Sequence, residues 1–387
     1  MKRFILLVVA LQMLFCACSN KYLNHEIKES MSAANEVNTE SFQGKIEYEE
    51  MRAVWISCFE LPKADQGEEK FMLKTDEIFK KLRDKDYNTA FVHVRPYADS
   101  IYPSEIFPWS KYCCDGKNPN FDPLKIIIKS ANKYNISVHA WINPFRISSN
   151  DDVASLAASS PARKMYADDS GDVIVLPCGI YFNPASPNVH ALIFKGVEEI
   201  LKNYSVDGIH IDDYFYPATD EKIDAKEFQE YKKSGGEMKL EQWRMDSLSA
   251  FMSGLHSLTQ KYGKLLSVSP SGNLKYNAEK MYADVELWMG EAGYTDIIIP
   301  QIYYGFENKK LPFIKTVETW MQIKRDESVR LVCGLAPYKV NKIDYNAGTQ
   351  GENEWEENKN IIQQQKEYLK AHNEVNGFAD FSYSFIP

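Results

Sequence analysis

The sequence lacks the features that mark several common classes of protein. Acidic residues outnumber basic ones, with 54 Asp and Glu against 45 Lys and Arg, so the formal net charge is −9. No basic patch is evident, and this balance argues against a nucleic-acid partner. No internal repeat or low-complexity tract stands out, which argues against a solenoid or a propeller.

Cysteine is scarce, and its spacing carries no recognisable motif. Of the seven cysteines in 387 residues, five lie beyond residue 18, and two of these, Cys113 and Cys114, are neighbours. Because a chain of this size does not need covalent cross-links, we predict no disulfide framework. Neither Cys-x-x-Cys nor His-Glu-x-x-His is present, so a zinc site has no local sequence support and we predict no cofactor.

The apolar run at the N-terminus is too short to span a membrane comfortably. It follows Met-Lys-Arg and extends to Phe15, which is typical of a signal peptide. Ala17 and Cys18 resemble the end of a bacterial lipobox. We therefore predict a lipoprotein signal peptide at 1–17, lipidation of Cys18, a polar tether at 18–50 and anchoring to a membrane of the cell envelope. Ordinary secretion with cleavage nearby is the alternative.

From residue 51 to 387, short apolar strands alternate with amphipathic helical segments. Strands are predicted at 52–57, 89–96, 137–143, 208–212, 265–271, 296–304, 330–337 and 377–385. Such alternation implies right-handed βαβ units and a parallel sheet, and eight units predict a (β/α)8 barrel. An open doubly wound sheet is the alternative. It usually carries a glycine-rich loop after its first strand, and residues 58–62 contain no glycine.

The strand at 208–212 ends in two adjacent carboxylates. Side chains of a strand alternate between its faces, so Ile209 and Ile211 share one face, and His210 and Asp212 share the other. With the isoleucines toward helices, His210 and Asp212 point into the barrel, and Asp213 lies just past the strand end. Burying an unpaired carboxylate is costly, so this pair indicates function. An aspartate that caps a turn or pairs with an arginine is the simpler alternative.

Other strands also end in polar and aromatic side chains, at the end of the barrel where such folds form their sites. These residues are Arg95, His139, Trp141, Asn143, Ser269, Gln301 and Tyr303, and loops at the same end add Asp99, Glu105, Arg146 and Tyr214. Polar side chains of these types bind sugar hydroxyls, aromatic rings stack on sugar faces, and glycoside cleavage uses two carboxyl groups. Asp212 or Asp213 supplies one carboxyl group. The second stays open between Glu105 and Asp99.

Several blocks of the chain resemble the glycosyl-hydrolase-like family 10 of bacteria. The blocks are Met51-Arg-Ala-Val-Trp-Ile56, Val94-Arg-Pro-Tyr-Ala-Asp99, Pro108-Trp-Ser110, His139-Ala-Trp-Ile-Asn-Pro-Phe-Arg146, Asp207-Gly-Ile-His-Ile-Asp-Asp-Tyr214 and Pro300-Gln-Ile-Tyr303. The resemblance implies a TIM barrel and an envelope glycosidase; some members act on peptidoglycan glycan strands stripped of peptides. It also implies roles for Asp212, Asp213, Glu105 and Arg95. Many members have an acidic residue just before Pro-Trp-Ser, where this chain has Phe107.

The sequence therefore predicts a membrane-anchored glycoside hydrolase that acts on an envelope polysaccharide, with Asp212, Asp213 and Glu105 as catalytic candidates. The candidates for binding the substrate are Arg95, Asp99, His139, Trp141, Asn143, Arg146, His210, Tyr214, Gln301 and Tyr303. A glycan-binding lipoprotein without catalytic activity is the alternative from a different class. A metal-dependent hydrolase using His139, His210 and Asp212 has less support, because the first strand lacks a His-x-His motif.

Overall fold

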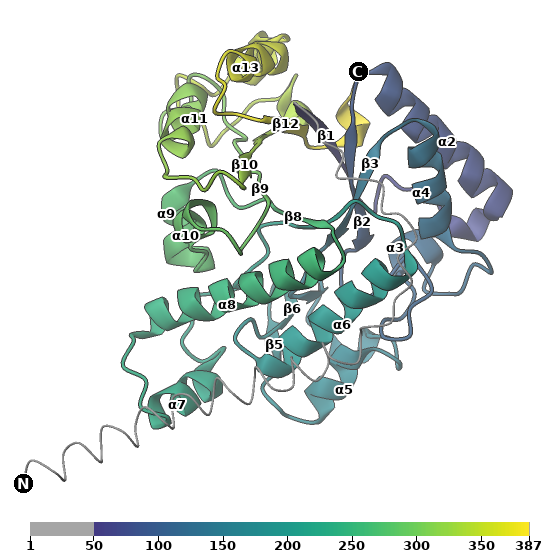
Figure 1. Cartoon of the computed structure of the whole chain (residues 1–387), viewed down its shortest axis with the longest axis vertical. Helices are drawn as coiled ribbons and strands as arrows, with labels where there is room; N and C mark the ends of the chain where they lie inside the picture. Colours follow the sequence, from purple (N-terminus) through teal and green to yellow (C-terminus); the bar gives the residue numbers. More distant parts are fainter. Residues whose placement is uncertain (1–49, 387) are drawn as a thin grey trace, which may run out of the picture. The chain divides into compact units, whose positions relative to one another are not determined.

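The computed structural model describes residues 50–386 as a parallel barrel wrapped by helices (Figure 1). The strands lie in the order β10-β9-β8-β7-β3-β2-β1-β12-β11, and all neighbours are parallel. Their bounds are β1 (Met51–Ile56), β2 (Thr89–Arg95), β3 (Ser137–Ile142), β7 (Gly208–Ile211), β8 (Leu265–Val268), β9 (Ile297–Ile298), β10 (Arg330–Leu331), β11 (Cys333–Leu335) and β12 (Gly377–Asp380).

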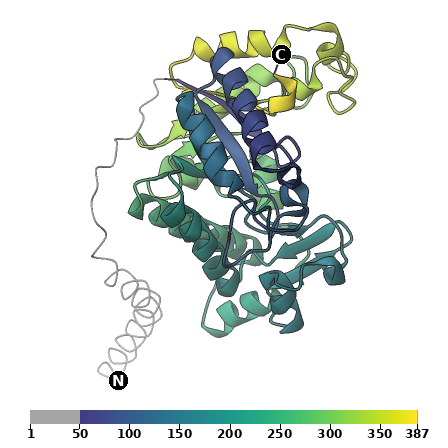
Figure 2. The same ribbon diagram turned by 90° about the vertical axis from the view of Figure 1, so that its right-hand side faces the viewer.

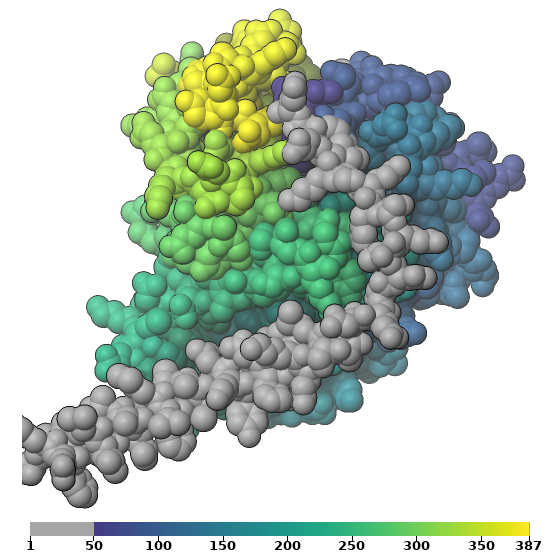
Figure 3. All heavy atoms as spheres, viewed as in Figure 1, coloured from purple at the N-terminus to yellow at the C-terminus, as the bar shows by residue number. Residues whose placement is uncertain are grey.

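The barrel is nearly closed, because β10 and β11 are successive parts of one stretch. β10 pairs with β9, whereas β11 pairs with β12, and the amide of Val332 between them donates to the carbonyl of Ile298 at 3.0 Å. β12 in turn pairs with β1, so the yellow C-terminal region lies beside the purple first residues of the barrel (Figure 3). The predicted (β/α)8 barrel is confirmed. The predictions for the signal peptide, Cys18 and the tether up to residue 49 lie outside the described residues.

Helices cover the outer side of the strands in both ribbon views (Figures 1 and 2). The main ones are α2 (Glu68–Asp84), α4 (Pro123–Lys133), α6 (Pro187–Asn203), α8 (Leu240–Lys261), α10 (Val285–Gly290), α11 (Phe313–Met321) and α13 (Ile361–Lys370). Helix α6 shows why they form where they do. The hydroxyl of Ser186 accepts from the amide of Val189, and proline occupies the first turn. Residues 50–386 contain no helix long and apolar enough to cross a membrane.

The stretch 144–187, which follows the predicted strand at 137–143 and was read from the sequence as a loop, forms a small subdomain. It contains an antiparallel sheet in the order β4-β6-β5, made of β4 (Arg146–Ser148), β5 (Val173–Leu176) and β6 (Gly179–Phe182), together with α5 (Pro161–Ala167). These strands have three or four residues each, too few for a period to be read. Helix α7 (Ala225–Lys233) was also missed; none of its residues is fully buried.

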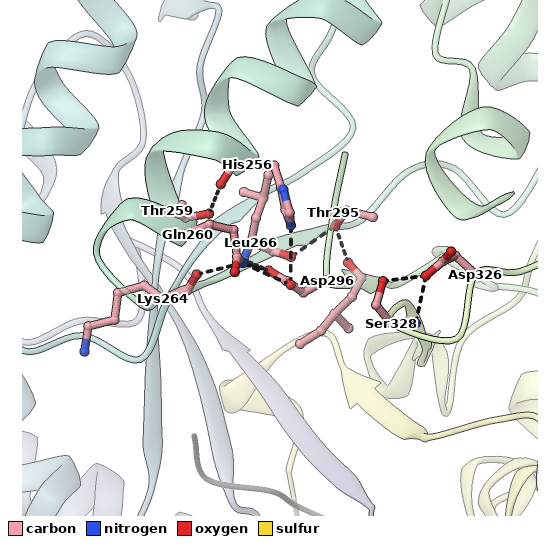
Figure 4. A network of polar contacts seen from close by, with 10 residues as sticks. His256, Thr259, Gln260, Lys264, Leu266, Thr295, Asp296, Asp326 and Ser328 are labelled. Carbon is pink, nitrogen blue, oxygen red and sulfur yellow. Dashed lines mark hydrogen bonds and ion pairs between the residues drawn. The ribbon is translucent and has the colours of Figure 1, made fainter. Parts of the chain in front are cut away.

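At the N-terminal end of the barrel, Asn and Asp side chains link neighbouring strands in pairs. In each pair, the side chain of the residue just before one strand accepts a hydrogen bond from a backbone amide near the start of the neighbouring strand. The pairs of amide and acceptor are Arg52 and Asn88 at 3.0 Å, Val138 and Asp207 at 2.8 Å, Leu266 and Asp296 at 2.7 Å, and Leu331 and Asn376 at 3.0 Å. Figure 4 shows the third pair, where Gln260 and His256 of α8 also reach Asp296. This end of the barrel therefore serves stability and leaves the opposite end for a site.

Candidate active site

A cleft of about 350 Å³ opens at the C-terminal ends of the strands. Nine of the residues predicted from the sequence line it: Trp141, Asn143, Arg146, Asp212, Asp213, Tyr214, Ser269, Gln301 and Tyr303. They come from the ends of β3, β7, β8 and β9 and from the loops that follow. The cleft is therefore assembled by strands far apart in the sequence.

The two aspartates lie where the alternation along β7 places them. Ile209 and Ile211 are fully buried in the apolar cluster shared with the surrounding helices, whereas Asp212 lines the cleft. Burial raises the pKa of Asp212 well above its usual value, and the charge of Asp213 raises it further. Burial also raises the pKa of Asp213, an effect that the Gln301 amide opposes. The pair therefore holds a proton at a pH where an exposed aspartate has lost its own.

Arg146, at the start of β4, projects toward this pair between two tyrosine rings. Its guanidinium carbon lies 4.9 Å from the centroid of Tyr97 and 4.5 Å from that of Tyr214. The positive charge lowers the pKa of both aspartates, although no ion pair with either lies among the described contacts. Its Nε is buried without a hydrogen-bond partner. Arg146 thus has a donor available for a ligand in the cleft.

Aromatic rings form the walls of the cleft. Trp141 lies flat on His93, with 3.6 Å between ring centroids and 6° between ring planes. The ring centroid of Tyr303 lies 6.0 Å from that of Tyr338 and 6.1 Å from that of Phe381. Sugar rings present an apolar face that suits such surfaces, so this cleft favours a carbohydrate over a small charged ligand.

Sequence reasoning missed several lining residues, His93 foremost. His93 is 6% exposed, its ring nitrogens have no hydrogen-bond partner in the described part of the chain, and burial lowers its pKa to about 3. It is therefore a neutral ring at the cleft with unused polar atoms. The other missed residues are Trp55, Ser57, Phe59, Tyr338, Phe381 and Ser382. Their positions at or beyond strand ends were the available signal.

Arg95 does not line the cleft, contrary to expectation. β2 has a bulge between His93 and Arg95, so that Arg95 pairs with Ile142 instead of continuing the alternation. The extra residue turns Arg95 to the outer face, where its guanidinium lies 4.5 Å from the ring centroid of Phe107 and against Gly196 of α6. Arg95 therefore holds the loop after β2 onto the barrel.

Glu105 and Asp99 also lie away from the cleft. Glu105 is exposed, and its amide donates to Glu199 of α6 at 2.7 Å. Asp99 is buried beneath the same loop, where it accepts from the amide of Tyr97, and burial raises its pKa to about 6. Neither carboxylate is placed to act with Asp212 and Asp213.

His139 and His210 point into the barrel but lie below the cleft. Both rings contact the hydroxyl of Ser267, at 3.1 and 2.9 Å, and the indole nitrogen of Trp55 lies 2.9 Å from Nε2 of His210. They form a polar layer inside the barrel wall and are not exposed to a ligand.

Residues 50–386 contain no group of three or more His, Cys, Asp or Glu side chains placed to hold a metal ion. The cysteines of this part of the chain are all free.

Known glycosidases share this fold. The glycoside hydrolase domain of PgaB (BpsB) from Bordetella bronchiseptica superposes with a TM-score of 0.57 at 12% identity, over 87% of this chain and 94% of that domain. The catalytic domain of β-amylase from Paenibacillus polymyxa gives a TM-score of 0.54 at 10% identity, over 87% of this chain and 92% of that domain.

Curated relatives are closer in sequence. Glycosyl hydrolase YngK of Bacillus subtilis is 32% identical over 325 residues, which cover 76% of this chain and 61% of the relative. Glycosyl hydrolase DigH of Escherichia coli K12 is 30% identical over 283 residues, covering 65% of this chain and 63% of the relative. The match thus spans less than two thirds of either relative. A family model for glycosyl hydrolase-like 10 matches residues 50–351, and the chain belongs to this family.

Proposed function

We propose that the protein is a glycoside hydrolase that cleaves an envelope polysaccharide with Asp212 and Asp213 as its acid and base. The main support for this proposal is that these adjacent carboxyl groups line an aromatic cleft and that both have raised pKa values. A glycosidase needs one carboxyl group that is protonated and one that is ionised. Asp212 and Asp213 meet this need at the end of β7, because a coupled pair of carboxyl groups holds one proton between them.

The roles follow from the proton balance of the pair. Asp212 is 4% exposed and hydrogen-bonded to Trp141, whereas Asp213 is partly exposed. The charge of Asp213 raises the pKa of Asp212 beyond the effect of burial, so Asp212 holds the proton and donates it to the glycosidic oxygen. Asp213 stays ionised and acts on the anomeric side, as nucleophile or as the base that activates water. Arg146, Asn143 and Gln301 bind hydroxyl or acetamido groups, while Trp141 and Tyr303 provide stacking faces.

Peptidoglycan glycan strands stripped of their peptides are the substrate we propose. The family membership motivates this choice, and the partly exposed cleft is open enough for a polymer. The direct test is digestion of peptide-free and intact peptidoglycan with mass analysis of the products, comparing wild type with Asp212→Asn and Asp213→Asn. We expect sugar fragments from the peptide-free strands with wild type only. Binding of the strands without fragments would favour the non-catalytic lipoprotein instead.

Glu105→Gln provides the comparison among carboxylates. Because Glu105 is exposed outside the cleft, we expect its variant to keep activity within about twofold, whereas Asp213→Asn loses at least ~100-fold. If Asp212 is the acid, Asp212→Asn should regain activity on substrates whose leaving group needs no proton. A loss with Glu105→Gln equal to that with Asp212→Asn would restore Glu105 as the acid.

We also propose that Cys18 carries a lipid that anchors the enzyme to a membrane of the envelope. The short apolar run that ends at Ala17-Cys18 motivates this proposal. Cys18→Ser should move the protein from the membrane fraction to the soluble fraction. Retention of the variant in the membrane fraction would argue against lipid anchoring at this residue.

A further inference from the structure

The cleft adjoins a second hollow that the proposed chemistry does not use. This hollow has a volume of about 390 Å³ and shares Gln301 and Tyr303 with the cleft as lining residues. Its remaining lining comes from the end of β8 and from the loops after β9 and β11, and includes the polar residues Asn308 and Asn346. A ligand that fills the cleft therefore has a polar path onward across Tyr303.

Hydrogen bonds hold the hollow in shape. Lys339 donates to the carbonyl of Tyr303 at 2.8 Å and to the carboxylate of Asp344 at 2.7 Å, which joins the two loops. The oxygen of the Asn308 side chain accepts from the amides of Lys310 and Leu311 at 3.1 and 3.0 Å. This fixes the amide so that its NH2 group is the part left for a ligand. Because these contacts fix the side chains in advance, little conformational freedom is lost when a ligand binds.

Exposed aromatic rings stand beside both the hollow and the cleft. Tyr345, next to the lining residue Asn346, is 77% exposed, and Phe59 at the cleft is 68% exposed. Among the exposed large hydrophobic residues of the described chain these two have the highest exposed fractions. Single exposed aromatics are ordinary on a protein surface. Here, however, Phe59 lines the cleft, and Tyr345 stands in the chain between Asp344 and Asn346, which both line the hollow.

We propose that this hollow, with Tyr345 as its stacking surface, is an additional sugar-binding subsite for the same glycan chain. The inference rests on the proposed function and extends it: the enzyme grips several consecutive sugars and cleaves within a chain. The amides of Asn308 and Asn346 bind hydroxyl or acetamido groups of the distal sugar. Stacking on Tyr345 removes apolar surface of ring and sugar from water.

The test uses peptide-free peptidoglycan oligosaccharides of two, four, six and eight sugars. For wild type, kcat/KM should rise with length. Tyr345→Leu keeps an apolar side chain but loses the flat ring, so it should lose about tenfold with the longest chains and nothing with the disaccharide. Tyr345→Phe should match wild type, and so should Leu73→Ala, which removes apolar surface from α2, where Leu73 is 57% exposed.

Binding separates this inference from the proposed function. The same oligosaccharides are titrated into wild type and Tyr345→Leu, with tryptophan fluorescence as the signal. Cleavage whose length dependence is unchanged in Tyr345→Leu overturns the subsite and leaves the glycosidase standing. Length-dependent binding that needs Tyr345, without cleavage by wild type, overturns the glycosidase and leaves the subsite standing. Absence of binding to either protein overturns the subsite for this glycan.

Discussion

The indole nitrogen of Trp141 lies 3.1 Å from Oδ2 of Asp212. It lies equally close to the side-chain oxygen of Asn143, and its ring is stacked on His93, so the indole is fixed from two sides. The hydrogen bond favours the ionised form of Asp212, whereas burial and the charge of Asp213 favour the protonated form. The proton balance of the pair therefore depends in part on this N–H group, which acts together with the amide of Tyr214 and the charge of Arg146.

Trp141→Phe tests that dependence, because it keeps a stacking ring and removes the donor. Without the donor, the ionised form of Asp212 is less stable, so the apparent pKa values of the pair rise. We expect the pH–rate profile to move to higher pH by up to about one unit.

The matched control is Trp55→Phe. Trp55 also lines the cleft, but its N–H bonds to His210 and not to an aspartate. The pH–rate profile of Trp55→Phe should keep its position on the pH axis even if the rate of cleavage falls. A profile for Trp141→Phe that stays in place, or moves to lower pH, would contradict the proposed role of the indole.

Asp212→Asn should lower activity by at least ~100-fold and raise stability at neutral pH. Because the folded-state pKa of Asp212 is raised, the folded chain holds a proton that the unfolded chain releases above pH about 4. The free energy of unfolding therefore falls as the pH rises through this window, and the loss is complete once the pH exceeds the folded-state pKa. Asn does not titrate and avoids the loss.

Thermal unfolding of both proteins at pH 3 and pH 8 measures this effect. The melting temperatures should nearly coincide at pH 3, where Asp212 is protonated in both states, and the variant should melt higher at pH 8. Asp151→Asn, which changes an exposed carboxylate, serves as the control and should show no such difference. A variant that melts lower than wild type at pH 8 would mean that the buried carboxylate stabilises the fold.

The barrel was predictable because its wall has a strong apolar signal. Residues such as Ile209 and Ile211 are fully buried against helices, and the long helices between strands carry apolar stripes. The subdomain after β3 was not predictable, because its packing is set by tertiary contacts over strands too short to show a period. The alternation of side chains along β7 also placed Asp212 on the inner side of the barrel, where it lines the cleft.

The errors at the site have two physical causes. A bulge, which the sequence does not reveal, interrupts the alternation of β2 after His93 and turns Arg95 outward. Depth along a strand was the second cause: each residue advances about 3.3 Å, so His139 lies about 13 Å below Asn143 at the end of β3. Facing the interior is therefore not sufficient for contact with a ligand, and His139 and His210 became part of the barrel core.

His93→Phe tests the residue that sequence reasoning missed. The substitution keeps a flat ring against Trp141 and removes both unpartnered nitrogens. If one nitrogen bonds a sugar hydroxyl, KM for the glycan should rise up to about tenfold, with kcat less affected. An unchanged KM would mean that His93 serves only as packing for Trp141, and a changed melting temperature would point to the same role.

Asp296→Ala tests whether the N-terminal end of the barrel serves stability alone. Asp296 accepts hydrogen bonds from the amide of Leu266 and from Gln260, so removal of its carboxylate leaves a strand amide without a partner. We expect a loss of about 1–3 kcal/mol in the free energy of unfolding, measured with urea, and unchanged kcat/KM at 25 °C. Asp326→Ala, in the same view (Figure 4), removes a partly exposed carboxylate that accepts from the amide and hydroxyl of Ser328 and bonds no strand amide of the described barrel, so it should cost less. A fall in kcat/KM with Asp296→Ala, in protein shown to be folded, would contradict the separation of stability and catalysis between the two ends of the barrel.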